Sequence, residues 1–543
     1  MHQCLSIPEI ARSIFDVLPE KDVLPLILSC RSFLEPGLDA HWRVLRSFKQ
    51  IAACFPEGLI KVKEEILVRE NYENPQRVKF LQLRRALTAT DLDRYLSRYA
   101  SRIRVFNLEL PFFYNSRDRT TFSIDLFQSL QLVTKWQPGV MSPLLKTFLW
   151  PNFDRDPYPS KEMPFSVFFS SCIGLFLGRN VETFKLPPVV HSSPVVLTTL
   201  QTALESMPQL KRLLFNPVQS SHLVVRCIRA APWINLNHAE ISSITLDMLL
   251  LLGTLPQLAY LKLGIQSVAT TDSSSSSDHI QDIFPALKTL DLRSPKPAKF
   301  SDVLRFFHSS PIRSLTLLSG KPAATKEAEA VVMGFQQHLN HRTLRVLSWT
   351  EHASMFNMQD TPDLRDIDVH DTIDISALFV FASLRSLILD LQKPVKLTQA
   401  EVAQIPVAWP AIRVLKLHNS TEHHVPLIDH THVLSIVSKC SHLASLAVPF
   451  DASRLTGEET ITGSPLELDW LYVDNDSSIY SPSRVLAFLK TNFAPSMALA
   501  GSKDRRWGMF MDSDDESEPK PVTFRSRWKA VVDGWEEHRE AHR

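Results

Sequence analysis

The most regular feature of the chain is an apolar pattern that returns from residue 102 onward. It consists of an apolar residue, two variable residues, an apolar residue, one variable residue and an apolar residue, as in Leu287-Lys-Thr-Leu290-Asp-Leu292. Its last four positions alternate apolar and variable, which is typical of a half-buried strand. Thirteen copies begin at Ile103, Leu145, Val181, Leu210, Leu258, Leu287, Ile312, Leu344, Leu364, Leu384, Ile412, Leu443 and Leu468. The pattern therefore predicts thirteen strands.

Amphipathic helical stretches lie between the predicted strands, at Pro194 to Met207, Ser301 to His308 and Thr325 to Leu339. A strand followed by a helix, repeated many times, requires parallel strands, so the fold class is α/β. Thirteen strands are too many for one open sheet of a compact, doubly wound domain. A solenoid has no such limit, because each unit packs only on its neighbours. We expect the solenoid, with the doubly wound domain as the alternative.

The first 46 residues have the spacing of three short helices. In the first helix, apolar side chains recur at helical intervals, at Ile10, Ile14, Phe15 and Leu18. The second helix is expected to follow Asp22 as its N-cap, which places Pro25 in the first turn, where a missing N–H breaks nothing. The third is expected to begin near Pro36 and to carry Trp42 on its apolar face.

Other segments complete the predicted organisation. They are a mainly helical connector at 49–101, the repeat array at 102–500 with a flexible serine-rich loop at 270–278, an acidic linker at 510–522 and a C-terminal helix at 523–543. On that helix Trp528, Val531, Val532 and Trp535 fall on one face. We expect this face to dock on the last repeats; a free helix that binds a partner is the alternative.

Composition narrows the function classes. Lys and Arg number 59 and Asp and Glu 58, so the net charge of +1 does not steer the chain toward nucleic acid or a membrane. The six cysteines are scattered, without a C-x-x-C pair, which indicates reduced thiols inside a cell. No leader and no apolar run of spanning length occur. These features predict a soluble protein of the cytoplasm, the nucleus or both.

Enzyme motifs are absent: the sequence has no G-x-G-x-x-G, P-loop, H-E-x-x-H or G-x-S-x-G. Histidines gather at His418, His423, His424, His430, His432 and His442, but a polar loop between repeats explains them more simply than a zinc site. We therefore expect no catalytic residues, no metal and no cofactor. An enzyme site in a long insertion between repeats is a competing hypothesis.

The N-terminal segment, residues 1–48, contains Pro8-Glu9-Ile10, Ile14-Phe15, Leu18, Lys21-Asp22-Val23-Leu24, Ser29-Cys30-Arg31-Ser32-Phe33 and Trp42. With these residues at this spacing, the segment resembles an F-box. The family usually has a Leu-Pro pair just before this stretch, where this chain has Ser6 and Ile7 and a leucine one place early. The family implies docking to a Skp-type adaptor. The adaptor contacts that it implies are Leu5, Pro8, Ile10, Ile14, Leu18, Val23, Leu24 and Trp42.

The strand pattern resembles the leucine-rich repeat, whose strand carries L-x-x-L-x-L. The spacing is irregular and the family's Asn or Cys after the strand is missing, so the right-handed solenoid that it implies is degenerate. Fungal F-box proteins with leucine-rich repeats look similar to this chain. The resemblance implies a non-catalytic substrate-recognition subunit of an SCF-type ubiquitin ligase, with a Skp-type adaptor, a cullin scaffold and an unknown target protein as partners. A repeat scaffold that acts without a ligase is the alternative.

In such a solenoid the variable strand positions line the open face of the sheet, where a target would bind. We expect Asp366, Asp368 and His370 to cluster with Asp390 on two adjacent strands. Further candidates on this face are Lys416, His418, Trp470, Tyr472 and Asp474. Such a surface would suit a basic or aromatic peptide, whereas a plain solvated face is the alternative.

Overall fold

The computed structural model describes residues 7–67, 76–108, 119–150, 171–186, 194–215, 229, 233–265, 283–351, 372–419, 426–461, 463–473, 477–501 and 524–542. Two compact units divide the chain, the first from Met1 to Leu258 and the second from Ala259 to Arg543. The first unit contains three N-terminal helices and a parallel sheet. The second contains a longer run of parallel strands and the C-terminal helix.

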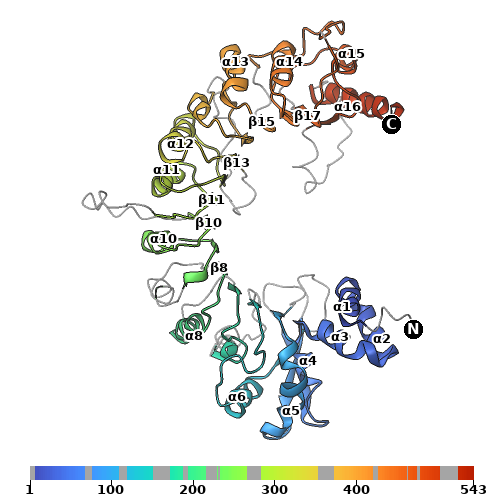
Figure 1. Cartoon of the computed structure of the whole chain (residues 1–543), viewed down its shortest axis with the longest axis vertical. Helices are drawn as coiled ribbons and strands as arrows, with labels where there is room; N and C mark the ends of the chain where they lie inside the picture. The colour runs from blue at the N-terminus through green and yellow to red at the C-terminus, as the bar shows by residue number, and fades with distance from the viewer. Residues whose placement is uncertain are drawn as a thin grey trace, which may run out of the picture. The chain divides into compact units, whose positions relative to one another are not determined.

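Three helices at the N-terminus lie together (Figure 1) and are here called the three-helix module. They pack around a small apolar core. They are α1 (Pro8–Val17), α2 (Glu20–Ser29) and α3 (Arg31–Trp42). Phe15 and Phe33 meet edge-to-face in this core, with ring centroids 6.0 Å apart. A Cβ on Gly37 of α3 would come within 2.2 Å of Ile27 Cγ1 on α2. The two helices can approach so closely because this position is glycine.

Two of these helices begin earlier than the sequence predicted. α2 begins at Glu20 with Pro19 as its N-cap, so Asp22 is not the cap and Pro25 lies inside the helix. α3 begins at Arg31, and Pro36 lies within it. The expectation was wrong because each proline was placed in a first turn, where its missing N–H costs nothing. Packing of the module's core stabilises both helices despite the lost bonds.

The first unit contains six parallel strands in the order β1-β4-β6-β7-β8-β9 among its described residues. They are β1 (Val44–Leu45), β4 (Val105–Asn107), β6 (Thr147–Leu149), β7 (Thr183–Leu186), β8 (Arg212–Phe215) and β9 (His238–Ile241). The helical segments between and after them are α6 (Ile124–Val133), η3 (Ile173–Leu175), α8 (Pro194–Glu205), η4 (Trp233–Asn235) and α10 (Leu246–Gly253). β1 follows α3 almost directly and pairs with β4. The three-helix module therefore joins the sheet at its first strand.

The sequence had suggested a mainly helical connector after the module, and this expectation was wrong. It contains the short helices α4 (Phe48–Ala52), α5 (Ala89–Arg98) and η2 (Ala100–Arg102), but also the strands β2 (Ile60–Leu67) and β3 (Gln76–Leu83). β2 and β3 pair antiparallel, and β5 (Arg119–Phe122) adds a third strand in parallel to β3. The hairpin escaped prediction because Glu64 and Glu65 break the alternation that begins with Ile60 and Val62 in β2.

The second unit contains nine described parallel strands in the order β10 to β18. They are β10 (Tyr260–Gly264), β11 (Thr289–Ser294), β12 (Ser314–Ser319), β13 (Val346–Glu351), β14 (Ser386–Leu391), β15 (Val414–Asn419), β16 (Ser445–Ala447), β17 (Trp470–Val473) and β18 (Ala498–Gly501). The helices are α11 (Lys299–Leu304), η6 (Arg305–Phe307), α12 (Thr325–His338), η9 (Ser376–Val380), α13 (Gln399–Ala408), α14 (His430–Lys439), α15 (Pro482–Asn492) and α16 (Phe524–Ala541). Helices α11 to α14 lie on one side of these strands (Figure 1).

Leucines of neighbouring strands in the second unit stand in register. One buried row consists of Leu261, Leu290, Leu315, Leu347, Leu387, Leu415, Leu446, Leu471 and Leu499. Within each unit the sheet order follows the chain order without reversal. A doubly wound sheet would reverse its order at a switch point. The fold is therefore mixed α/β with a solenoid-like run of parallel strands.

Within the parallel array, the predicted strands and the observed ones differ at four places. β13 and β14 pair directly with each other, although the sequence predicts a strand at 364–369 between them. Those residues lie outside the described part of the chain. The strands β1, β9 and β18 were missed: Ala239 stands where a leucine was sought in β9, and β1 and β18 are too short or too alanine-rich to show the pattern.

The C-terminal helix α16 packs on the end of the second unit. Trp528 and Trp535 are buried, and their indole N–H groups donate to Ser477 O and Met497 O, each at 2.8 Å. Val531 is also buried, whereas Val532 is only partly covered. The apolar face predicted from the sequence is therefore occupied by the chain itself, and the free helix is excluded.

Candidate docking surfaces

The three-helix module has two apolar faces. The inner face forms its core, with Ala11, Phe15, Val23, Ile27 and Phe33. An outer set of apolar side chains is exposed to solvent: Ile10 and Val17 on α1 and Leu24 and Leu28 on α2, with exposed fractions of 37%, 83%, 50% and 76%. Ile7 and Leu34 are exposed as well. The module therefore offers apolar surface in excess of its own core, and we call Ile10, Val17, Leu24 and Leu28 the outer apolar residues.

The outer apolar residues follow from helical spacing. Leu24 and Leu28 stand one turn apart on one side of α2, and Ile10 and Val17 lie on one stripe of α1 with the half-buried Ile14 between them. Sequence reasoning named Ile10 and Leu24 but missed Val17 and Leu28. The second stripe at i and i+4 in α2 was the signal that would have found Leu28.

The expected adaptor contacts divide between surface and core. Pro8, Ile10 and Leu24 are exposed, and Ile14 and Leu18 are half-buried. Val23 and Trp42 are buried, at 5% and 7% exposure, so they hold the fold together and offer no docking surface. Leu5 lies outside the described residues. The structure thus separates exposed residues from core residues, which the sequence could not do.

Trp42 attaches the three-helix module to the connector. Its ring stacks on Tyr99 with centroids 4.5 Å apart and an interplanar angle of 28°, and it also meets Tyr95 at 6.2 Å. The hydroxyl of Tyr95 donates to Met141 O at 2.6 Å, and burial raises the pKa of this hydroxyl well above its ordinary value. Trp42 therefore links α3, through α5, to the loop that precedes β6.

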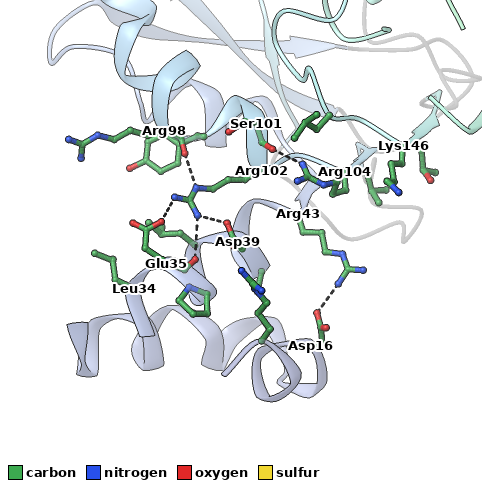
Figure 2. A pocket seen from close by; sticks show the side chains of 18 of the residues that line it. Asp16, Leu34, Glu35, Asp39, Arg43, Arg98, Ser101, Arg102, Arg104 and Lys146 are labelled. Carbon is green, nitrogen blue, oxygen red and sulfur yellow. Dashed lines mark hydrogen bonds and ion pairs between the residues drawn. The ribbon is translucent and has the colours of Figure 1, made fainter. Parts of the chain in front are cut away.

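Beside this aromatic contact, a cavity of about 1250 Å³ lies between the module and the edge of the sheet (Figure 2). Its charged lining consists of the cations Arg12, Arg43, Arg98, Arg102, Arg104 and Lys146 and the carboxylates Asp16, Glu35 and Asp39. Arg102 pairs with both Glu35 and Asp39 of α3, and its Nε donates to Arg98 O at 2.8 Å. Partial burial lowers the pKa of Arg102, but the two carboxylates raise it above its ordinary value overall. The ion pairs of Arg102 beside this cavity thus attach α3 to η2, and we call them the charged joint.

Replacing Arg102 by alanine is expected to lower the free energy of unfolding of the first unit by about 1 kcal/mol, because two partly exposed ion pairs with α3 are lost. The loss should shrink at high salt, which screens such pairs. Urea unfolding at low and high salt measures both effects. Arg98→Ala is the matched control, since Arg98 has no side-chain ion pair among the described residues. Equal losses of unfolding free energy in the two variants would contradict the stabilising role of the Arg102 ion pairs.

The open face of the second unit carries a row of variable residues in register, as the strand pattern predicted. It runs through Lys262, Asp291, Thr316, Ser348, Ile388, Lys416, Ala447 and Tyr472. The ammonium of Lys416 reaches across the small side chain of Ala447 and lies 3.8 Å from the ring centroid of Tyr472. Trp470 stacks on Tyr472 at 5.8 Å and is 46% exposed. These three candidate residues therefore do come together.

The expected acidic cluster around Asp390 is not assembled as predicted. β14 is hydrogen-bonded to β13 on one side and to β15 on the other, so Asp390 stands between Thr350 and His418. Asp366, Asp368, His370 and Asp474 lie outside the described residues, and only the backbone of His418 is described. A surface for a basic peptide built on two neighbouring acidic strands is therefore withdrawn.

The described residues show no cluster of three or more His, Cys, Asp and Glu side chains that could hold a metal ion. Of the histidine-rich stretch, His432 pairs with Asp429, the N-cap of α14, at 2.7 Å. Partial burial acts to raise the pKa of Asp429, but the hydrogen bonds of Thr431 and His432 to this carboxylate outweigh it and lower the pKa to about 2. None of the described helices combines the length and apolar composition that crossing a bilayer requires.

Comparison with known proteins assigns neither surface. The function must be inferred from the chain's own residues and contacts. No protein-family model matches the chain, and a search of curated protein sequences finds no match to it.

Proposed function

We propose that this chain is the substrate-recognition subunit of an SCF-type ubiquitin ligase. In this proposal the three-helix module is an F-box that docks a Skp-type adaptor, and the strand array is a leucine-rich-repeat solenoid that holds a target protein. The chain supplies no bond chemistry. It raises the effective concentration of the target's lysines near the charged ubiquitin-conjugating enzyme, which turns a bimolecular encounter into a nearly intramolecular one.

The observation that carries the proposal is the set of outer apolar residues. Leu24 and Leu28 stand on one side of α2 and leave much of their surface in water. Covering such a side chain contributes on the order of 1 kcal/mol or more to association. Pro8, Ile10 and Leu24, which the F-box resemblance implies as contacts, are all on the surface. A helical adaptor groove fits this chemistry, since apolar anchors at i and i+4 are the usual way in which a helix docks.

The joint between the module and the sheet supports the tethering role. Stacking of Trp42 on Tyr99, the Arg102 ion pairs and the pairing of β1 with β4 hold the module on the first strands of the array. A receptor gains from such rigidity, because a fixed joint keeps a bound target within reach of the transferred ubiquitin.

Charge substitution of the outer apolar residues tests the proposal. The full-length chain carrying Leu24→Asp and Leu28→Asp should bind a purified fungal Skp-type adaptor at least about a hundredfold more weakly than the unaltered chain, because two desolvated carboxylates would face an apolar groove. Isothermal titration calorimetry measures the loss. Since both side chains are exposed, the free energy of unfolding should hardly change.

The matched control is Val407→Asp on α13, because Val407 is an exposed apolar side chain of the second unit, at 80% exposure. It should bind the adaptor as the unaltered chain does. If the unaltered chain does not bind the adaptor, the ligase proposal fails and a repeat scaffold remains. Ser6 and Ile7, which replace the family's Leu-Pro pair, are the observation that favours this second candidate.

A further inference from the structure

A row of cations stands at the position just before five consecutive strands of the second unit, β11 to β15. The residues are Lys288, Arg313, Arg345, Arg385 and Arg413, and we call them the basic ladder. Each backbone N–H bonds to the carbonyl of the preceding rung: Arg313 to Lys288 at 2.8 Å, and Arg345, Arg385 and Arg413 in the same way at 2.7 to 2.8 Å. All five side chains are exposed. At a strand spacing of about 4.8 Å, the ladder is about 19 Å long.

No described residue neutralises the basic ladder. None of its five side chains makes an ion pair or a hydrogen bond with another residue that the structure describes. The next positions along the strands are uncharged: Thr289, Ser314, Val346, Ser386 and Val414. Asp291, two positions further along β11 than Thr289, is an acid, but it pairs with Arg293. Like charges on adjacent strands repel one another, so the row is held together at an electrostatic cost.

The first unit shows how the same position looks when it is neutralised. There Lys146, Glu182 and Lys211 occupy consecutive rungs, linked by the same backbone bonds at 2.8 Å. Glu182 pairs with Lys146 at 3.3 Å and with Lys211 at 3.0 Å. The ion pair with Lys211 and then that with Lys146 lower the pKa of Glu182, against the effect of slight burial. One acid thus compensates two cations, and the second unit lacks such an acid among its five rungs.

We propose that the basic ladder binds an acidic segment of a partner protein. Four of its five cations are arginines, whose planar guanidinium groups bind carboxylates in pairs of hydrogen bonds. A linear row of charge suits a linear polyanion, and carboxylates on successive turns of a helix or on alternate residues of an extended chain repeat every 5 to 7 Å, roughly as the rungs do. In a substrate receptor the acidic segment would belong to the target, and that last step rests on the proposed function.

The surroundings of the basic ladder favour a peptide over nucleic acid. Proteins that bind single strands combine cations with aromatic side chains on which bases stack. The row beside the ladder contains threonine, serine and valine but no aromatic residue. The whole chain has a net charge of only +1, so the ladder is a local concentration of charge within a nearly neutral protein. A net charge this small does not favour the steering of nucleic acid by a broad positive field.

The test measures binding of a dye-labelled peptide of alternating glutamate and alanine to the full-length chain by fluorescence anisotropy, with the glutamine analogue as the neutral probe. Arg345→Glu places an acid between Arg313 and Arg385, as Glu182 stands between two lysines. It should weaken peptide binding at least about tenfold and leave the unfolding temperature unchanged or higher, because repulsion becomes attraction. Arg385→Glu is the second variant. Lys326→Glu, an exposed cation on α12, changes the net charge equally and should keep binding.

The proposal is overturned if the chain binds the glutamate and glutamine peptides equally, or if Arg345→Glu and Lys326→Glu behave alike. Tighter binding of single-stranded oligothymidylate than of the glutamate peptide, lost in Arg345→Glu, would also overturn it and mark a nucleic-acid surface. Adaptor binding measured on the same variants separates the two proposals. Arg345→Glu should retain adaptor binding. If the unaltered chain binds the peptide but not the adaptor, the proposed function of the basic ladder stands and only the ligase proposal fails.

Discussion

Replacing Glu351 by alanine is expected to lower the free energy of unfolding of the second unit by about 2–5 kcal/mol at about pH 5. Glu351 ends β13 and is only 3% exposed. Its two carboxyl oxygens accept from Ala323 N at 2.9 Å and from Gln392 N at 2.7 Å. Alanine would leave the buried N–H of Ala323 and the partly buried N–H of Gln392 without acceptors, in the connections that follow β12 and β14. The side chain therefore ties three consecutive strands together.

The size of this effect should depend on pH. Burial raises the pKa of Glu351 to about 7 from its ordinary 4.5, the negative charge of Asp390 adds to the rise, and the two N–H bonds partly oppose it. Between these two pKa values the folded chain keeps a proton that the unfolded chain has released. The stability contributed by protonated Glu351 is therefore complete below about pH 4.5 and is lost as the pH rises to about 7, a change of about 3 kcal/mol.

Unfolding in urea from about pH 5 to about pH 8 tests this dependence, with hydrogen exchange of peptides from β12 to β14 to localise it. The difference between the unaltered chain and Glu351→Ala should shrink as the pH rises. Glu351→Gln keeps the volume and one acceptor but turns an NH₂ group toward a second N–H. It should therefore be intermediate in stability and should lack the titration. A difference that stays constant with pH would contradict the raised pKa.

Replacing Trp42 by alanine is expected to destabilise the first unit by about 3–5 kcal/mol. The indole is 7% exposed and fills the space between α3 and α5, where it stacks on Tyr99 and meets Tyr95. Alanine would leave a cavity in this contact and release the module from the connector. Thermal unfolding measures the loss, and hydrogen exchange should show it in α3 and α5 rather than in the second unit.

Trp42→Phe distinguishes packing from adaptor contact. Phenylalanine retains an aromatic ring against Tyr99, so we expect a loss of about 1–2 kcal/mol in stability and no change in adaptor affinity. The sequence had placed Trp42 among the adaptor contacts. If Trp42→Phe weakened adaptor binding while stability stayed the same, the direct contact would be restored and the buried position of this ring would be wrong.

The sequence alone determined the features that repeat locally. The strands and their buried side could be predicted from Leu290, Leu292 and the apolar residues at the same positions of the other strands. This was possible because alternation is a property of neighbouring residues. Helical spacing likewise gave α1, α8 and α12, and the apolar face of α16. Strands without the pattern could not be predicted from the sequence. Examples are β9, where Ala239 replaces the expected leucine, and the exposed hairpin of β2 and β3.

The tertiary structure decided everything that depends on which segments meet. Only the pairing of β14 with β13 and β15 showed that Thr350 and His418 are the neighbours of Asp390 in the sheet. Only packing showed that Trp42 is an anchor while Leu28 faces solvent, since both lie on apolar stripes of their helices. The basic ladder appears only when strands far apart in the chain stand side by side, because the repulsion or pairing of charges depends on distance in space and not on separation along the sequence.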